Sequence, residues 1–343
     1  MRAVLLGAGW IARKIYIPAL LDSGNIDEII VVDPAPGGDL PSGRVRHASL
    51  EEAAARRADW AFVLSPNHLH CDHLLAAMEF APDIFVEKPA CLGRREAERI
   101  QAAAERMRPR VQVSAPFRLR RDLQDLRTLL RSGEIGRVYG TELRWCKKRG
   151  VPGSPWFCER GRAGGGALID MGPHLLDLHR WLVGRSAERG CTSLTVDLDP
   201  ADNSVFASWH RGSATERLEA TVEAAAYSQM LFEDSFLRLD VAWVSPVERD
   251  MAQLRFVGTR GALDLETALG FSTDTLVQGS SFKLTSADST REWRSEIGDR
   301  SQLFVDGVTR MVRGETVEFP PLSEGLAVAV QIEQLYASAG RTV

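Results

Sequence analysis

The chain has 343 residues, enough for two domains that each bury an ordinary core without disulfides or metals. Its formal net charge is −4, with 26% charged and 44% hydrophobic residues, so it lacks the basic surface of a nucleic-acid-binding protein. No apolar run approaches the roughly 20 residues of a membrane-spanning helix.

The cysteines and the N-terminus indicate a reducing, cytoplasmic location. The five cysteines are scattered and lack CxxC spacing, which argues against a disulfide framework. The first ten residues, MRAVLLGAGW, contain a short apolar run, but no small-residue cleavage pattern follows. We therefore interpret them as a first strand rather than a signal peptide.

The first 115 residues alternate between strand-like and helix-like segments. The strand-like segments are nearly continuous apolar runs, at residues 2–8, 28–33, 60–65, 84–89 and 110–115. Such runs are typical of parallel strands buried on both faces. The segments between them are rich in helix-forming residues, and Ser49 and Glu52 have the spacing of a capping box. This alternation predicts an α/β domain with a doubly wound parallel sheet.

The second half of the chain has a different pattern. A strand-like segment at 137–148 is followed by a glycine-rich turn and a helix within 161–183. Further strand-like segments then recur without crossover helices, at residues 204–210, 216–227, 235–244 and 252–266. We expect a large, open, mostly antiparallel sheet, followed by a last amphipathic helix at about 323–340.

A glycine motif follows the first strand. Gly7, Gly9 and Ala12 have the G-x-G-x-x-A form, in which the glycines allow a tight turn and the close approach of a pyrophosphate to a helix N-terminus. We assign Gly7 and Gly9, with Trp10 and Ile11, to cofactor binding.

Asp33 ends the second strand, 21 residues after Ala12, where a carboxylate accepts hydrogen bonds from the adenosine ribose. The alternative is an aspartate that starts a turn before Pro34. A Pro-Ala-Pro run follows without an adjacent arginine for a 2′-phosphate, which favours NAD over NADP. Arg44 or Arg46, if folded back, would favour NADP instead.

Polar residues also follow the third strand, in the segment LSPNHLHCDH at 64–73. We assign four of them to the cofactor site, with Asn67 near the nicotinamide ribose: Ser65, Pro66, Asn67 and His70. The three histidines and Cys71 also raise the possibility of a metal site. On a helix they would point in different directions, and no second ligand group has matching spacing, so we predict no metal.

Two segments supply candidate catalytic groups. The fourth strand ends in Glu87-Lys88-Pro89, and Lys88 is one of only five lysines among 42 basic residues. It is either a solvated loop charge or a catalytic ammonium. In 162–184, Asp170, His174 and Asp177 are spaced to share one helix face.

Because proline is favoured in the first turn of a helix, Pro173 predicts that the helix within 162–184 begins near 170–172. Asp170 would then be a cap or first-turn residue. His174, one turn from a carboxylate, has the position of a general base. The alternative is a partly buried histidine whose hydrogen bonds a neighbour satisfies.

Five segments, GAGWIARKIYIPAL, SPNHLH, EKP, SGEIGRV and GGGALIDMGPHLLD, occur in the order seen in the glucose–fructose oxidoreductase and inositol dehydrogenase family, Gfo/Idh/MocA, which the chain resembles. The resemblance implies an NAD(P)-binding Rossmann domain, at residues 1–118, and a substrate and oligomerisation domain, at 119–343. The last helix would pack back on the first domain, and the open sheet would form a homodimer or homotetramer. The departure is at 113–120, where relatives often carry Asn or His before an aromatic-Arg-Phe run.

The resemblance also implies the activity: NAD-dependent oxidation of a secondary hydroxyl of a sugar, nucleotide sugar, aminoglycoside-type sugar or cyclitol. Its catalytic residues map onto Lys88, Asp170 and His174. Glu87 would hold the strand end or pair with Lys88, and a cis Lys88–Pro89 bond is expected. Further candidates for substrate contact are Arg118, Trp156 and Arg162, although Trp156 is equally a candidate for the core.

The alternatives are an NAD-dependent glycosidase that uses transient oxidation, a non-catalytic NAD-binding regulatory protein, and a biliverdin-reductase-like enzyme. The bias towards arginine over lysine is typical of a GC-rich genome, which suggests a secondary-metabolite sugar pathway as a hypothesis.

Overall fold

A computed structural model of the chain describes residues 1–35, 43–198, 207, 221–272 and 279–343. The chain forms two compact units. Unit 1 comprises Met1–Leu119 and Ser301–Val330, and unit 2 comprises Arg120–Arg300 and Gln331–Val343. The strand predicted at 204–210 lies outside the described residues, apart from Ala207.

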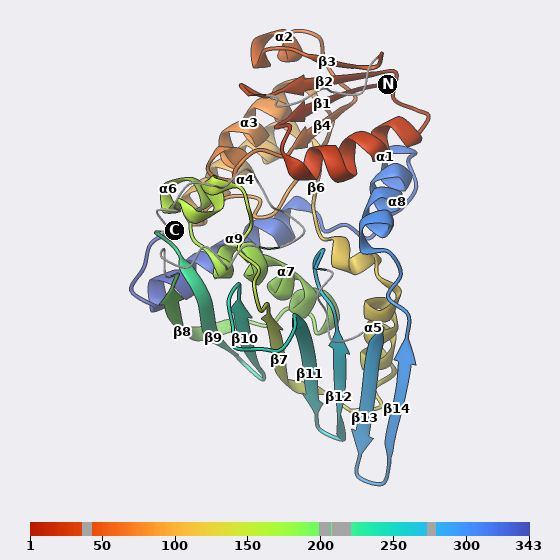
Figure 1. Cartoon of the computed structure of the whole chain (residues 1–343), viewed down its shortest axis with the longest axis vertical. Helices are drawn as coiled ribbons and strands as arrows, with labels where there is room; N and C mark the ends of the chain where they lie inside the picture. The colour runs from red at the N-terminus through yellow and green to blue at the C-terminus, as the bar shows by residue number, and fades with distance from the viewer. Residues whose placement is uncertain (36–42, 199–206, 208–220, 273–278) are drawn as a thin grey trace. The chain divides into compact units, whose positions relative to one another are not determined.

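Unit 1 contains a six-stranded sheet in the order β3-β2-β1-β4-β5-β6, and every neighbouring pair is parallel (Figure 1). The predicted doubly wound α/β fold is therefore confirmed. The strands are β1 (Arg2–Leu6), β2 (Glu28–Val32), β3 (Val45–His47), β4 (Trp60–Val63), β5 (Asp83–Val86) and β6 (Arg110–Val113).

Helices connect these strands. They are a π-helical segment (Ala12–Tyr16) continued by α1 (Ile17–Asp22), then α2 (Leu50–Ala54), α3 (His70–Phe80) and α4 (Arg94–Met107). The predicted capping box is present at the start of α2, because the Ser49 side chain accepts the Glu52 N–H and Glu52 accepts the Ser49 N–H.

The core of unit 1 includes side chains from the end of the chain. Leu322, Leu326 and Ala329 of α9 (Leu322–Ser338) belong to the buried cluster that contains the central strands. The α8 helix (Arg300–Val312) places Phe304 edge-on against Tyr16, with ring centres 5.7 Å apart. The Thr309 hydroxyl of α8 donates a hydrogen bond to the Ala19 carbonyl of α1. Residues 301–330 thus complete the core of unit 1.

Unit 2 contains an eight-stranded sheet in the order β14-β13-β12-β11-β7-β10-β9-β8. Among the strand pairs that the structure describes in this sheet, the central β7–β10 pair is parallel and the others are antiparallel, so the predicted open and mostly antiparallel sheet is confirmed. The strands are β7 (Val138–Cys146), β8 (Glu188–Asp197), β9 (Glu223–Phe232), β10 (Phe236–Ala242), β11 (Met251–Gly258), β12 (Gly261–Thr267), β13 (Ser280–Ser286) and β14 (Thr290–Ser295).

One face of this sheet is covered by α7 (Ala167–Leu182), which packs against β7, β9 and β10. Unit 2 also includes α5 (Arg121–Ser132) and α6 (Arg160–Ala163). Within the described part of the chain, every helix is too short or too polar to span a bilayer.

Candidate active site

The glycine turn after β1 requires glycine at its first position. Gly7 has a φ of +112°, and a Cβ placed there would lie 2.8 Å from backbone atoms of Leu64 and Ser65. Its N–H donates to the Val32 carbonyl at 2.9 Å, so the turn is tied to the end of β2. A side chain at this position would separate β1 from its neighbours.

The residues beyond Gly7 fit a dinucleotide. A Cβ on Gly9 would meet no atom within 4 Å, so space is open beside the backbone where a pyrophosphate would approach. Trp10 and Ile11 are half-buried and begin the helical segment that follows. The Asp33 carboxylate accepts the Ala8 N–H at 2.7 Å and the Ala35 N–H at 2.8 Å. Each oxygen keeps a lone pair for a ribose hydroxyl.

The loop after β4 is held by two histidines. Asn67 is buried in the turn Asn67–Leu69, and His73 Nδ1 lies 2.9 Å from Ser65 Oγ. His70 is buried, with Nε2 2.7 Å from the Ser65 carbonyl oxygen and Nδ1 2.6 Å from the Pro89 carbonyl oxygen. Among the residues that the structure describes, no group of three or more His, Cys, Asp or Glu side chains is placed to hold a metal.

Lys88 is half-buried in the turn after β5, and the Lys88–Pro89 bond is cis. The Tyr16 hydroxyl donates to Glu87 Oε1 at 2.5 Å, and Glu87 Oε2 accepts the Lys88 N–H at 3.2 Å. Burial raises the pKa of Glu87, against the opposing effects of Tyr16 and Lys88. Burial likewise raises the pKa of Tyr16, so the phenol remains a donor.

In unit 2, α7 begins at Ala167, so the helix start predicted at 170–172 is wrong and Pro173 lies inside the helix. The physical reason is a cap supplied from a distant strand. Glu223 is fully buried at the start of β9, and its Oε1 accepts the N–H groups of Gly166 at 2.8 Å and Leu168 at 3.1 Å. A carboxylate is favourable at a helix N-terminus, where these N–H groups have no partner within the helix.

Tyr336 of α9 belongs to the same network. Its hydroxyl donates to Glu223 Oε1 at 2.6 Å and accepts the Ile169 N–H at 3.2 Å. A Cβ on Gly165 would lie 2.0 Å from this hydroxyl, and one on Gly166 would lie 2.0 Å from the Glu223 carbonyl oxygen. Two of the three glycines before α7 therefore make room for the cap, a role that the sequence pattern does not reveal.

Asp170 and His174 lie on successive turns of α7, and both are half-buried. The first-turn position predicted for Asp170 is confirmed. The Trp243 indole N–H donates to Asp170 Oδ2 at 2.9 Å, and the His174 ring centre lies 6.0 Å from that of Trp145. These tryptophans come from β7 and the end of β10, the parallel pair beneath the helix. Sequence reasoning missed both of them.

Lys147 is a buried basic residue close to this helix. The basic run 147–149 is typical of a solvated face, yet Lys147 is only 4% exposed. Its Nζ lies 5.3 Å from the centre of the Trp145 ring, within the range of a cation–π interaction. A buried ammonium therefore adjoins the ring that lies beside His174.

The three substrate candidates have different surroundings. Arg118 of unit 1 is buried and forms an ion pair with Glu324 at 2.7 Å. In unit 2, the half-buried Trp156 ring stacks on Phe157 with centres 3.9 Å apart. Arg162 is exposed, 3.5 Å from Glu159.

The structure thus brings Asp170 and His174 together within unit 2, and Lys88 with the cofactor-binding candidates within unit 1. Convergence of the lysine and the histidine on one substrate remains a prediction.

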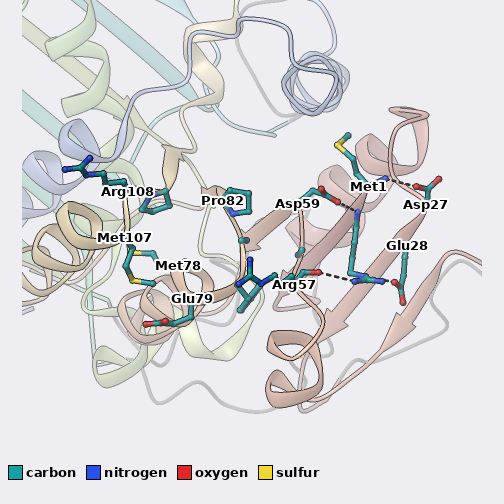
Figure 2. Close-up of a pocket in the computed structure, with 15 residues that line it drawn as sticks. Met1, Asp27, Glu28, Arg57, Asp59, Met78, Glu79, Pro82, Met107 and Arg108 are labelled. Atoms are coloured by element: carbon teal, nitrogen blue, oxygen red, sulfur yellow. Dashed lines mark hydrogen bonds and ion pairs between the residues drawn. The ribbon is translucent and has the colours of Figure 1, made fainter.

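A pocket of about 720 Å³ lies at the opposite edge of the unit 1 sheet (Figure 2). Its walls include residues that immediately precede strands, such as Asp27, Asp59, Pro82 and Pro109. It contains none of the candidate residues. Ligands of open α/β sheets bind beyond the carboxyl ends of the strands, so the candidate site does not include this pocket.

The glycine turn and the strand order of unit 1 are those of a dinucleotide-binding domain. Comparisons with known proteins agree. Residues 1–115 match the model of the oxidoreductase family with an NAD-binding Rossmann fold. Residues 123–264 match the GFO/IDH/MocA C-terminal domain. The chain belongs to the Gfo/Idh/MocA oxidoreductase family, and the predicted NAD cofactor is confirmed at that level.

Relatives span nearly the whole chain. The putative UDP-kanosamine synthase oxidoreductase subunit of Amycolatopsis mediterranei (strain S699) is 30% identical over 99% of this chain and 96% of its own length. D-glucoside 3-dehydrogenase of Escherichia coli (strain K12) is 24% identical over 99% of this chain and 95% of its own. An oxidoreductase from Agrobacterium radiobacter, solved with NAD+, L-tartaric acid and magnesium, shares the fold, with a TM-score of 0.77 at 18% identity over 100% of this chain and 98% of that one.

The Tyr336→Phe variant tests the cap of α7. It leaves the buried Ile169 N–H without its partner and removes one of the three hydrogen bonds that Glu223 Oε1 accepts. Such losses cost about 1–3 kcal/mol. We expect the free energy of unfolding to fall by that amount, measured by denaturant unfolding. Tyr139→Phe, at a side chain 40% exposed, is the matched control and should change it by less than about 0.5 kcal/mol. An equal loss of unfolding free energy in the two variants would show that the hydrogen bonds of Tyr336 do not stabilise the start of α7.

Proposed function

We propose that the protein is an NAD-dependent dehydrogenase that oxidises a secondary hydroxyl of a glycoside or nucleotide sugar. The observation that carries the proposal is the Asp170–His174 pair, in which Trp243 fixes the carboxylate one helical turn from the imidazole. The two relatives, a D-glucoside 3-dehydrogenase and a putative UDP-kanosamine synthase oxidoreductase subunit, support a glucose-type ring. The hydroxyl on carbon 3 is therefore the first to test.

Each catalytic residue has a distinct role. His174 takes the proton of the substrate hydroxyl, and Asp170 orients the imidazole and stabilises it once protonated. Lys88 donates a hydrogen bond to the same oxygen and so stabilises the negative charge that develops there. When bound, NAD supplies the hydride acceptor, C4 of the nicotinamide. Proton transfer to a positioned base typically contributes about 10²–10⁴-fold to the rate.

The cofactor residues hold NAD at the edge of the parallel sheet. The open side of Gly9 admits the pyrophosphate to the helix N-terminus, with Trp10 and Ile11 beside it. Asp33 binds the adenosine ribose hydroxyls and repels a 2′-phosphate, which favours NAD over NADP. Ser65, Pro66 and Asn67 lie after the neighbouring strand, on the nicotinamide side.

A glycosidase that uses transient oxidation is the second candidate, because it needs the same cofactor and the same acid–base groups. The two activities differ in their products. A dehydrogenase accumulates NADH with the sugar, whereas the glycosidase releases a hydrolysed glycoside without net NADH. Absorbance at the NADH band, recorded with UDP-glucose and with a methyl glucoside as substrates, separates the two. A protein that binds NAD but yields neither product would be regulatory.

Lys88→Ala and His174→Ala test the catalytic assignment. Each should lower kcat by at least about a hundredfold, because each removes a group that acts on the reacting oxygen. The dissociation constant for NAD should change little. Lys283→Ala and His47→Ala, which alter exposed side chains, are the controls. Activity near that of the wild type in either test variant would end the mechanism as described.

Asp33→Ala tests the cofactor preference. The change removes the acceptor for the ribose hydroxyls and the charge that repels a 2′-phosphate, so the ratio of kcat/KM for NAD to that for NADP should fall. Steady-state kinetics with both cofactors measures this ratio. Asp72→Ala, which breaks an exposed ion pair with Arg99, is the control. An unchanged ratio would remove Asp33 from this role.

We also propose that the protein forms a homodimer or homotetramer through the open face of the unit 2 sheet. Four large apolar side chains are exposed on β8 and β9: Leu194, Val196, Tyr227 and Leu231. Leu194 is 65% exposed and pairs across the strands with Tyr227. Clustered apolar side chains on a sheet face are typical of an interface.

The Leu194→Asp and Leu231→Arg double variant tests this assembly. Two charges placed in an apolar interface oppose association, so light scattering after size exclusion should report a smaller species than for the wild type. Thr290→Asp, on the exposed β14 strand at the other edge of the sheet, is the control. An unchanged mass in the double variant, or a monomeric wild type, would contradict the interface.

A further inference from the structure

We propose that His70 is a positioning residue: it ties the loop after β4 to the turn that carries Lys88, and it acts on the reaction through that lysine. The inference rests on the proposed function, because it takes Lys88 to be catalytic. The sequence pattern groups His70 with the residues that touch the cofactor. In the structure both of its ring nitrogens lie at hydrogen-bond distance from backbone carbonyl oxygens of unit 1.

The geometry places the ring between two loops. His70 is the first residue of α3 and is 1% exposed. Its Nε2 lies 2.7 Å from the Ser65 carbonyl oxygen, and its Nδ1 lies 2.6 Å from the Pro89 carbonyl oxygen. These carbonyls follow β4 and β5, which are neighbours in the sheet. Both polar atoms of the side chain are thus directed at protein acceptors, one on each loop.

The protonation state decides how many of these contacts are hydrogen bonds. A neutral imidazole donates from one nitrogen, and an imidazolium donates from both. Burial disfavours the charged ring and dominates over the two carbonyls, which favour it, so the pKa of His70 is lowered to about 4. The two short contacts oppose the effect of burial, because only a ring that donates from both nitrogens forms a hydrogen bond with the carbonyl of each loop.

The Lys88 turn is also held on its other side. Glu87 Oε2 accepts the Lys88 N–H, and the Tyr16 hydroxyl fixes Glu87 Oε1. The backbone is therefore anchored at the residue before Lys88 and, through His70, at the residue after it. A histidine that contacted only a ligand would not hold the backbone on the Pro89 side of this turn.

The functional consequence follows from the tolerance of catalysis to misplacement. A shift of about 1 Å in a reacting group can cost on the order of a hundredfold in rate. Loss of the His70 bridge frees the Pro89 side of the turn and moves the Lys88 ammonium from the reacting oxygen. It leaves the glycine turn and Asp33, which bind the cofactor, unchanged. The expected signature is a lower kcat at constant affinity for NAD.

A double-mutant cycle tests the coupling. The four proteins are the wild type, His70→Phe, Lys88→Ala and the double variant; phenylalanine keeps the ring and removes both nitrogens. His70→Phe should lower kcat by roughly tenfold or more, with the NAD dissociation constant within about twofold. Added to Lys88→Ala, it should cause no further loss of kcat, because the residue that it positions is already absent.

Other outcomes would overturn the inference. Wild-type kcat in His70→Phe would show that the bridge is not needed, and a weaker NAD affinity would point to a cofactor contact. Multiplied losses in the double variant would separate His70 from Lys88. Full activity of Lys88→Ala alone would instead reject the proposed function. His47→Phe, at an exposed histidine, is the control. If His70→Phe does not fold, His70→Leu, which also removes both nitrogens, replaces it in the same cycle with the same expectations.

Discussion

The candidate site of unit 1 depends on a property of parallel strands: their carboxyl ends all meet at one edge of the sheet. Gly7, Asp33, Ser65 and Lys88 follow four different strands, and the order β2-β1-β4-β5 makes those strands successive neighbours. The winding of the chain reverses between β1 and β4, and at such a reversal the loops leave room for a ligand. Residues up to 81 positions apart in the sequence thus reach one edge without any specific attraction between them.

The regular part of the fold could be predicted because it depends on local patterns. Apolar runs of four or five residues reveal buried strands, and the sequence predicts β1, β2, β4, β5 and β6 correctly. The exception in this sheet is β3, which has three residues, none of them fully buried, and so carries no apolar signal. The start of α7 could not be predicted, because the carboxylate that caps it comes from Glu223, more than fifty residues later.

The candidate catalytic groups can be found from the sequence, whereas the side chains that contact them cannot. Lys88, Asp170 and His174 lie in short motifs of unusual composition. Trp243 is 73 residues from Asp170, and Tyr16 is 71 residues from Glu87, so no spacing rule connects either pair. Lys147 shows the same limit, because the two residues that follow it, Lys148 and Arg149, are exposed charges, while its own ammonium lies over Trp145. Catalytic roles can be proposed from motifs, whereas the orientation of the side chains requires the folded chain.

Unit 1 is formed by two separate stretches of the chain, Met1–Leu119 and Ser301–Val330, and this affects how it folds during synthesis and how it can be transferred to another protein. The six strands are complete by Val113, yet Phe85 packs edge-on against Phe319, and Tyr16 packs against Phe304. During translation, this side of the sheet therefore stays exposed until α8 and α9 have left the ribosome. A chimeric protein that contained only the first 119 residues would have all six strands of this sheet, but its aromatic cluster would be exposed to water. Such a chimera would therefore need other residues in place of α8 and α9.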